Sequence, residues 1–292
     1  MTAGVPLKPR ALPAAAALRR NRWLVLGVAA TIALVVLVVL SFTGVIGGGG
    51  SPRRDAVAAY IEQVNTTQRG LAIERDRIGK VYARARRDPQ GLAGNIADLD
   101  RSTATLRRFD RRLRALTPPA EAAELHRRLL VLSAAEATFA AEIGRLGRFL
   151  PVLATERQAV GVAGAKLQRA LAATTKPEEQ AVAFEGFAVA VEAAAEPLPG
   201  AQVPTSLEPI RVAELERTTA LAVSARALAR AVRDGRSADA RRLVQSFGKA
   251  AAGEGNAVER AAIIAFDKQG RRINTLRLAV AQERARLDRE LS

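Results

Sequence analysis

Apolar residues follow two different patterns along this chain of 292 residues. Residues 23–46 form an apolar run without a single charged side chain. From residue 52 onward, apolar residues return at intervals of three, four and seven, which is the spacing of helices with one buried face. No stretch alternates apolar and polar residues over a useful length, so no strand is expected. The sequence predicts an all-α protein with a single N-terminal transmembrane helix followed by an antiparallel helical bundle.

The apolar run predicts a membrane-spanning signal-anchor helix. Its 24 residues would measure about 36 Å as a helix, which exceeds the roughly 30 Å of a hydrocarbon core. A cleaved secretory signal has an apolar region of only about 7–15 residues and ends at a small-residue cleavage site, which this run lacks. A buried core helix would carry a polar stripe. The residues expected to anchor the chain include Trp23, Leu24, Leu34, Leu40 and Ile46.

Basic residues before the span predict its orientation. Residues 1–22 contain five basic residues and no acidic one, and such segments stay on the cytoplasmic side. We therefore expect a cell-membrane protein with a cytoplasmic tail (1–22), a span (23–46), a Gly-rich linker (47–51) and an extracytoplasmic helical bundle (52–292). The tail is too short for a signalling domain, so any signal would need a partner protein. The topology-setting residues are Lys8, Arg10, Arg19, Arg20 and Arg22.

Three long helices are predicted first in the outer part, at about 52–87, 89–115 and 118–150. Each carries an apolar residue at every seventh position, a pattern typical of coiled-coil-like packing between near-parallel neighbours. Prolines at the two short breaks make successive helices antiparallel. The repeating residues are Val57, Val64, Leu71, Ile78 and Ala85, then Leu92, Leu99, Leu106 and Leu113, then Leu125, Leu132, Phe139 and Leu146.

The second half is less regular and predicts helices at about 152–174, 177–196, 209–233 and 237–290. The last one is either continuous or broken near Gly253-Glu254-Gly255. A five-residue pattern occurs in both halves: Ala123-Glu-Leu-x-Arg127 is repeated as Ala213-Glu-Leu-x-Arg217. We call this repeat the five-residue echo. One bundle and two stacked halves both remain open.

Two segments carry a loose family resemblance. Leu113-x-x-Leu-Thr-Pro-Pro-x-Glu121 with Leu125-His-x-x-Leu129, and the closing Gln282-Glu-Arg-Ala-Arg-Leu-Asp-Arg-Glu-Leu291, resemble patterns in uncharacterised membrane-anchored or secreted helical proteins of high-GC bacteria. The resemblance implies the location and the helical fold, and it brings no activity or functional residues.

Composition excludes several classes of function. With no cysteine, the chain has no disulfide, thiolate metal site, cysteine nucleophile or lipoprotein anchor. One histidine cannot form a site with two imidazoles, and 4% aromatic residues argue against base stacking and thus against nucleic acid. Neither a nucleophile elbow nor a phosphate-binding loop is present. We expect no enzyme activity, no catalytic residue, no metal and no cofactor.

Two single residues allow a functional and a structural interpretation. Glu136 lies in the apolar seam between Leu129 and Ile143. It could be a buried acid with a raised pKa that binds a proton, a cation or a basic ligand. The structural interpretation, an edge position or a pairing with an arginine across the bundle, is favoured. His126 lacks a Glu-x-x-His partner and is expected to be a surface histidine.

Charge is the remaining feature. The part after the span has 40 basic and 29 acidic residues, a net charge of +11. This excess is either a solvated surface laced with ion pairs, which is the favoured interpretation, or a surface that attracts anionic lipid or wall polymers. We expect a binding or structural module of the cell envelope; the alternative is a ligand-detecting sensor or accessory subunit with a membrane protein partner. The densest basic cluster is Arg107, Arg108, Arg111, Arg112 and Arg114.

Overall fold

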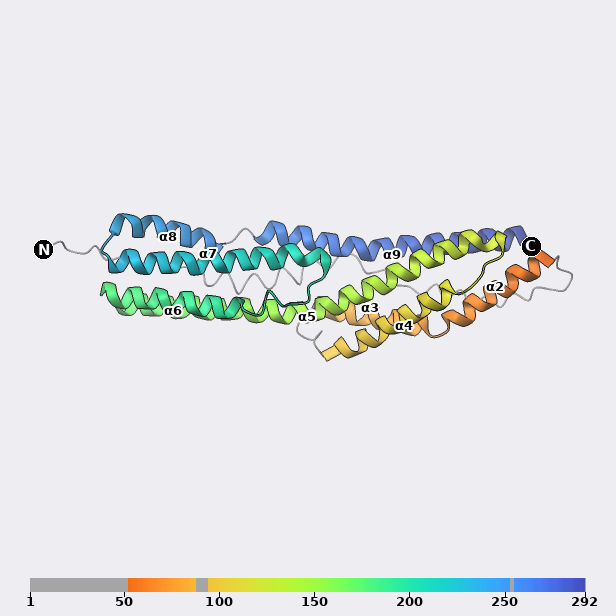
Figure 1. Cartoon of the computed structure of the whole chain (residues 1–292), viewed down its shortest axis with the longest axis horizontal. Coiled ribbons are helices and arrows are strands. Elements are labelled where there is room, and N and C mark those ends of the chain that lie inside the picture. The colour runs from red at the N-terminus through yellow and green to blue at the C-terminus, as the bar shows by residue number, and fades with distance from the viewer. Residues whose placement is uncertain (1–51, 88–93, 253–254, 292) are drawn as a thin grey trace. The chain divides into compact units, whose positions relative to one another are not determined.

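The computed structural model describes residues 52–87, 94–252 and 255–291, which are helical with short connections (Figure 1). The all-α prediction is confirmed, because these ranges contain no strand. Within them, no helix is both long enough and apolar enough to cross a membrane. The cytoplasmic tail, the apolar run 23–46 and the linker lie outside the described residues, so the span and its orientation stay predictions.

The chain divides into two compact units. The described part of unit 1 consists of residues 148–252 and 255–264, and that of unit 2 consists of residues 52–87, 94–147 and 265–291. Two long helices, α5 (Ala123–Ala173) and α9 (Gly255–Leu291), contribute residues to both units. Of the two architectures that the sequence left open, this division favours two halves.

Unit 2 is built from α2 (Pro52–Gln68), α3 (Leu71–Arg87), α4 (Ile96–Arg114), the start of α5 and the end of α9. A short 3-10 turn, η2 (Ala120–Ala122), precedes α5. The single helix expected over 52–87 was wrong. It breaks before α3 because Gly70 has a φ of +86°, in the left-handed region that a right-handed helix cannot include.

The apolar seam of unit 2 is largely confirmed. The repeating positions of α2, α3 and α4 are buried wherever the structure describes their side chains. In α5 the strict repeat fails, because Phe139 and Leu146 are only half-buried while Ala140 and Ile143 are buried. A straight helix drifts by about 20° per seven residues, so the buried face moves to neighbouring positions. The buried repeats are Val57, Val64, Leu71, Ile78, Leu99, Leu106, Leu113, Leu125 and Leu132.

The helix boundary expected near Pro151 was also wrong. Helix α5 is 51 residues long and continues through this proline without a break. A proline inside a helix costs about 3 kcal/mol or more, because it removes a hydrogen bond and crowds the preceding turn. Phe149 and Leu153 are almost completely buried on either side of it. Burying two large apolar side chains contributes about 1.5–3 kcal/mol each, which offsets the cost of the proline.

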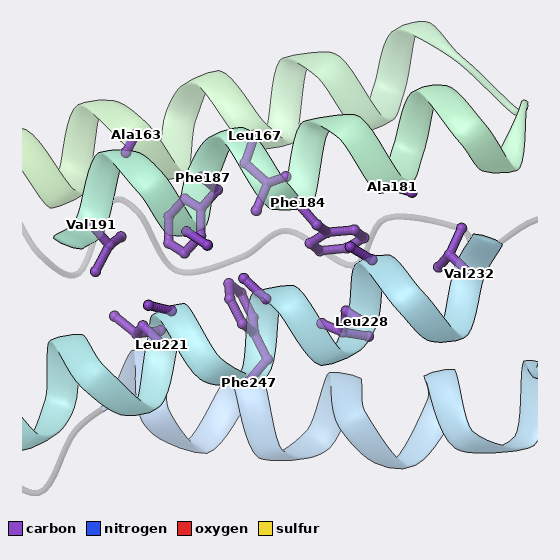
Figure 2. Packing of buried hydrophobic residues seen from close by; sticks show 14 residues of the cluster. Ala163, Leu167, Ala181, Phe184, Phe187, Val191, Leu221, Leu228, Val232 and Phe247 are labelled. Carbon is purple, nitrogen blue, oxygen red and sulfur yellow. The ribbon is translucent and has the colours of Figure 1, made fainter. Parts of the chain in front are cut away.

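Unit 1 packs the second part of α5 with α6 (Pro177–Ala195), α7 (Glu208–Arg233) and α8 (Ser237–Ala252). A 3-10 turn, η3 (Thr205–Leu207), leads into α7. The predicted helices at 177–196 and 209–233 are confirmed to within one residue. Residues 253 and 254, where the last helix was expected to break, lie outside the described residues. Figure 2 shows Phe247 of α8 edge-on to Phe184 and Phe187 of α6, with ring centroids 6.4 and 5.4 Å away. These rings form the centre of an apolar core.

Candidate functional site

The predicted site residues that the structure describes lie on α4. All five arginines of the basic cluster are exposed, while Leu106, Phe109 and Leu113 of the same helix are buried. Arg114 donates from Nε to Asp110 Oδ2 at 2.8 Å, and Ser133 of α5 donates to Asp110 Oδ1 at 2.6 Å. Asp110 is therefore directed toward α5 rather than along the exposed side. The membrane-anchor and topology-setting residues lie outside the described ranges.

Four arginines of this cluster remain without an ion pair among the residues described. Burial opposes the ionised form of Asp110, but its hydrogen bonds from Arg114 and Ser133, together with the positive charges of Arg114 and Arg111, outweigh burial and lower its pKa. The single carboxylate within the cluster is thus already engaged. We call the other four side chains the α4 basic surface. They are Arg107, Arg108, Arg111 and Arg112.

Buried glutamates are the second notable feature. A buried carboxylate is costly unless it is paired and hydrogen-bonded, and all those found in the described ranges contact arginine. In unit 2, Glu136 Oε2 accepts hydrogen bonds from Arg75 Nη2 and Nε at 2.7 and 3.0 Å, and Arg277 Nε donates to Oε1 at 2.9 Å. The predicted pairing of Glu136 with arginine is confirmed. The buried glutamates are Glu136, Glu142, Glu156, Glu214 and Glu283.

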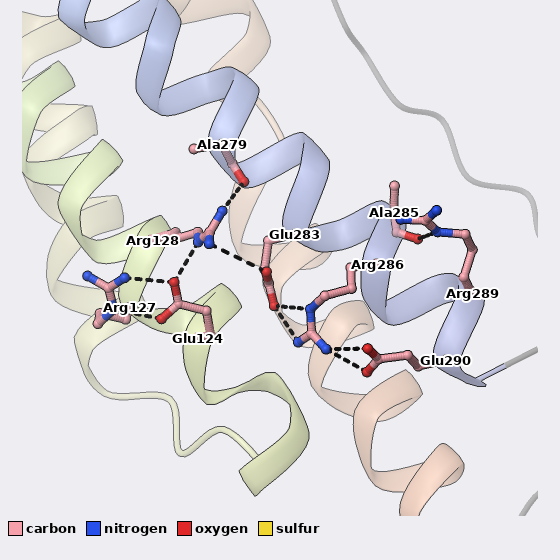
Figure 3. Close-up of polar contacts among 9 residues, drawn as sticks. All are labelled: Glu124, Arg127, Arg128, Ala279, Glu283, Ala285, Arg286, Arg289 and Glu290. Atoms are coloured by element: carbon pink, nitrogen blue, oxygen red, sulfur yellow. Dashed lines mark hydrogen bonds and ion pairs between the residues drawn. The ribbon is translucent and has the colours of Figure 1, made fainter.

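A second network in unit 2 joins α5 to α9 (Figure 3). Arg128 of α5 donates from Nε to Glu124 at 2.6 Å and from Nη1 to the Ala279 carbonyl of α9 at 3.0 Å. Its Nη2 lies 3.7 Å from the buried Glu283, which also accepts a 2.5 Å hydrogen bond from Arg286. This network fixes helix packing and leaves little positive charge available to a ligand.

Unit 1 contains the most buried charges, which we call the α5–α7 ionic cluster: Glu156 and Arg157 of α5 with Glu214 and Arg217 of α7. Arg157 donates to Glu214 Oε1 from Nε at 2.8 Å and from Nη2 at 2.5 Å. Arg217 donates from Nε to Glu214 Oε2 at 2.6 Å and from Nη2 to Glu156 Oε1 at 3.0 Å. The second carboxylate oxygen of Glu156, Oε2, is buried without a hydrogen-bond partner in the described structure.

The two carboxylates of the cluster differ in their affinity for protons. Burial opposes the ionised form of Glu214, but the charges and hydrogen bonds of Arg157 and Arg217 outweigh it and lower the pKa of Glu214. Burial raises the pKa of Glu156 to about 7, and the negative charge of Glu214 adds to this rise, while the two arginines offset only part of it. Environments that push two neighbouring pKa values apart identify which group holds the proton. Here it is Glu156.

The sequence interpretation missed this cluster, although a signal was present. Glu156 continues the buried face between Leu153 and Ala163, at helical spacings of three and seven. All three residues lie within the helix predicted at about 152–174, so this spacing could be recognised in the sequence. The five-residue echo did contain Glu214 and Arg217, and both copies form the same local ion pair. One copy is largely solvent-accessible and the other is buried, which the sequence pattern alone does not distinguish.

His126 differs from its expected surface position. It is half-buried, and its Nδ1 shares a hydrogen bond with Tyr60 Oη over 2.9 Å. Burial lowers the pKa of His126, and burial also raises the pKa of Tyr60 to about 12. A neutral imidazole can accept this hydrogen bond, so His126 joins α5 to α2. In the described ranges, no group of three acidic or histidine side chains could hold a metal ion.

No protein family model, curated protein or solved structure matches the chain. The resemblance to helical proteins of high-GC bacteria therefore stays a prediction, and the function must be inferred from the residues themselves.

Proposed function

We propose that the chain is a single-pass membrane protein whose helical part lies on the outer side and binds anionic phospholipid headgroups through the α4 basic surface. The observation that carries this proposal is the set of four exposed arginines along the second half of α4 that form no ion pair with any described residue. A guanidinium can form two parallel hydrogen bonds to a phosphate, which makes arginine well suited to this ligand. Each such cation contributes about 1 kcal/mol near an anionic membrane.

Two arginines of α7 in unit 1 provide a contrast. Arg226 forms an ion pair with Glu192, and Arg233 contacts Glu178 and Glu185. Such arginines are neutralised by their neighbours and stabilise the packing of α7 against α6. The positive charge of the helical part is therefore not equally accessible to an anionic ligand everywhere. Among the residues described, the α4 basic surface offers unpaired positive charge, whereas these two positions of α7 do not. Basic residues in the last turn of α4 also complement its helix dipole, a local effect that is compatible with lipid binding.

The position of unit 2 in the chain supports the same ligand. The five linker residues 47–51 can extend over at most about 18 Å, so α2 would begin close to the outer end of the proposed span. Helix α4 belongs to the same unit as α2. A tethered surface meets a high local concentration of headgroups, so weak individual contacts suffice for binding.

Vesicle binding tests the lipid proposal. A fragment of residues 52–292 should sediment with vesicles containing anionic phospholipid at low salt, and much less at high salt, because salt screens charges beyond roughly 8–10 Å. Changing Arg108, Arg111 and Arg112 together to glutamine should weaken binding about tenfold or more at low salt. Circular dichroism should show unchanged helicity, since these side chains are exposed.

The matched control removes the same charge elsewhere. Changing Arg127, Arg226 and Arg233 to glutamine lowers the net charge equally but removes arginines that already have carboxylate partners. This variant should retain binding close to that of the parent. Equal weakening of vesicle binding by both triple variants would mean that binding depends only on the total net charge. That result would contradict the proposal.

Reporter fusions test the proposed topology. A reporter that is active only in the cytoplasm should work when fused before Lys8 and fail when fused after Ser292, because the basic tail resists translocation. Replacing the five basic residues of the tail with neutral ones should produce mixed orientations. An active reporter at the C-terminus of the parent chain would overturn the orientation.

A further inference from the structure

Glu156 differs from Glu136 and Glu214 in how its carboxylate is satisfied. Both oxygens of Glu136 accept hydrogen bonds, and so do both oxygens of Glu214. In Glu156, Oε1 accepts a hydrogen bond from Arg217, while Oε2 is buried without a hydrogen-bond partner among the described residues. The side chain is 1% exposed, so water cannot replace the missing partner without a change in packing. An ionised carboxylate is poorly accommodated at this position.

The charged side chains around Glu156 favour its neutral, protonated form over its ionised form. They are Arg157 on its own helix and Glu214 and Arg217 on α7. Glu214 accepts two hydrogen bonds from Arg157 and a third from Arg217. A second negative charge at Glu156 would compete for these guanidiniums and would repel Glu214. A neutral Glu156 leaves Glu214 with both of its arginine partners and removes the repulsion.

We propose that Glu156 is a proton-binding site that makes the packing of α5 against α7 in unit 1 sensitive to pH. With the proton bound, the cluster keeps α5 and α7 tightly packed. When the proton leaves, the ionised carboxylate opposes this packing and unit 1 becomes less stable. The site concerns unit 1 alone and is independent of lipid binding by α4.

The direction of the effect follows from linkage. The pKa of Glu156 in the folded chain is about 7, above its ordinary value of 4.5, so the folded chain holds a proton that the unfolded chain has released. The resulting stability is fully present below about pH 4.5 and is lost as the pH rises through about 7. Between about pH 5.5 and pH 8.5, the folding equilibrium constant should fall about thirtyfold from this group alone.

Thermal unfolding of the full chain in detergent, with and without Glu156→Gln, tests the proposal. Glutamine is neutral at all pH values and has nearly the same shape. The parent should therefore lose several degrees of melting temperature relative to the variant between about pH 5.5 and pH 8.5. Taking the difference between the two proteins cancels groups present in both, including His126, whose lowered pKa acts in the opposite direction. A difference that does not change with pH would overturn the proposal.

The matched control is Glu192→Gln. This glutamate joins α6 to α7 in the same unit, and its hydrogen bond with Arg226 lowers its pKa. The ion pair of Glu192 gives its full stabilisation above the ordinary glutamate pKa near 4.5. The difference in melting temperature between Glu192→Gln and the parent should therefore stay constant over the same pH window. A slope equal to that of Glu156→Gln would show a general effect of charge and would overturn the assignment to Glu156.

A direct titration keeps the proposal testable if Glu156→Gln fails to fold. Carbon NMR of the parent chain, labelled at the glutamate side-chain carboxyl carbon, should show a resonance that titrates near pH 7. Where the variant folds, that resonance should be missing from its spectrum. If no glutamate carboxyl titrates above about pH 6, Glu156 does not hold a proton and the proposal is wrong.

Discussion

Replacing Leu106 with aspartate is expected to lower the free energy of unfolding by about 3–5 kcal/mol. Leu106 is 2% exposed and lies at the centre of the buried stripe of α4, between Leu99 and Leu113. The substitution removes apolar burial and places a charge in an apolar seam. Leu132→Asp on α5 should have a comparable effect, because Leu132 is also buried. Chemical unfolding followed by circular dichroism measures both losses.

The control for Leu106→Asp lies two residues earlier on the same helix. Ala104 is exposed, and Arg107 and Arg108 follow it at the third and fourth positions, where a carboxylate can pair with them. Ala104→Asp should therefore change the stability by no more than about 0.5 kcal/mol. Equal losses at residues 104 and 106 would mean that helix propensity rather than burial controls α4, and would contradict the register of its buried stripe.

Glu214→Gln is expected to cost about 3 kcal/mol or more, because it removes the carboxylate that holds two mostly buried arginine side chains. The side chains of Arg157 and Arg217 are only 9% and 14% exposed, so neither can fully regain water. The substitution should also lower the pKa of Glu156, since the charge of Glu214 helps to raise it. Urea unfolding gives the loss of stability, and the carboxyl resonance of Glu156 gives the change in pKa.

Glu136→Gln in unit 2 provides the comparison for Glu214→Gln. Glu136 also holds two arginines, but the side chains of Arg75 and Arg277 are 24% and 33% exposed. They can turn toward water when the negative charge is lost, so a smaller cost of about 1–2 kcal/mol is expected. A loss at Glu136 as large as that at Glu214 would show that the exposure of the partner arginines does not set the cost.

Helix content and most helix ends could be predicted because both depend on local sequence. The seven-residue repeats of α2, α3 and α4 follow from the helical period, and Pro177 begins α6 because a proline is well accommodated in the first helical turn. Two predictions failed: a continuous helix through Gly70 and a helix end at Pro151. In both places the outcome depends on whether packing outweighs the local preference of the backbone. At Gly70 the backbone conformation ends the helix, whereas at Pro151 the packing on both sides outweighs the local cost.

The sequence by itself determined the helical class of the described residues, the buried stripe of α4 and the exposure of its arginines, since each follows from the position of a residue around one helix. Only the tertiary structure decided which buried glutamates have hydrogen-bond partners for both carboxylate oxygens. Glu136 and Glu156 both occupy apolar seams of α5. Arginines from other helices bind both oxygens of Glu136, whereas one oxygen of Glu156 has no hydrogen-bond partner in the described part of the chain. The partners of a buried charge come from distant parts of the chain, and its protonation depends on their number and distance.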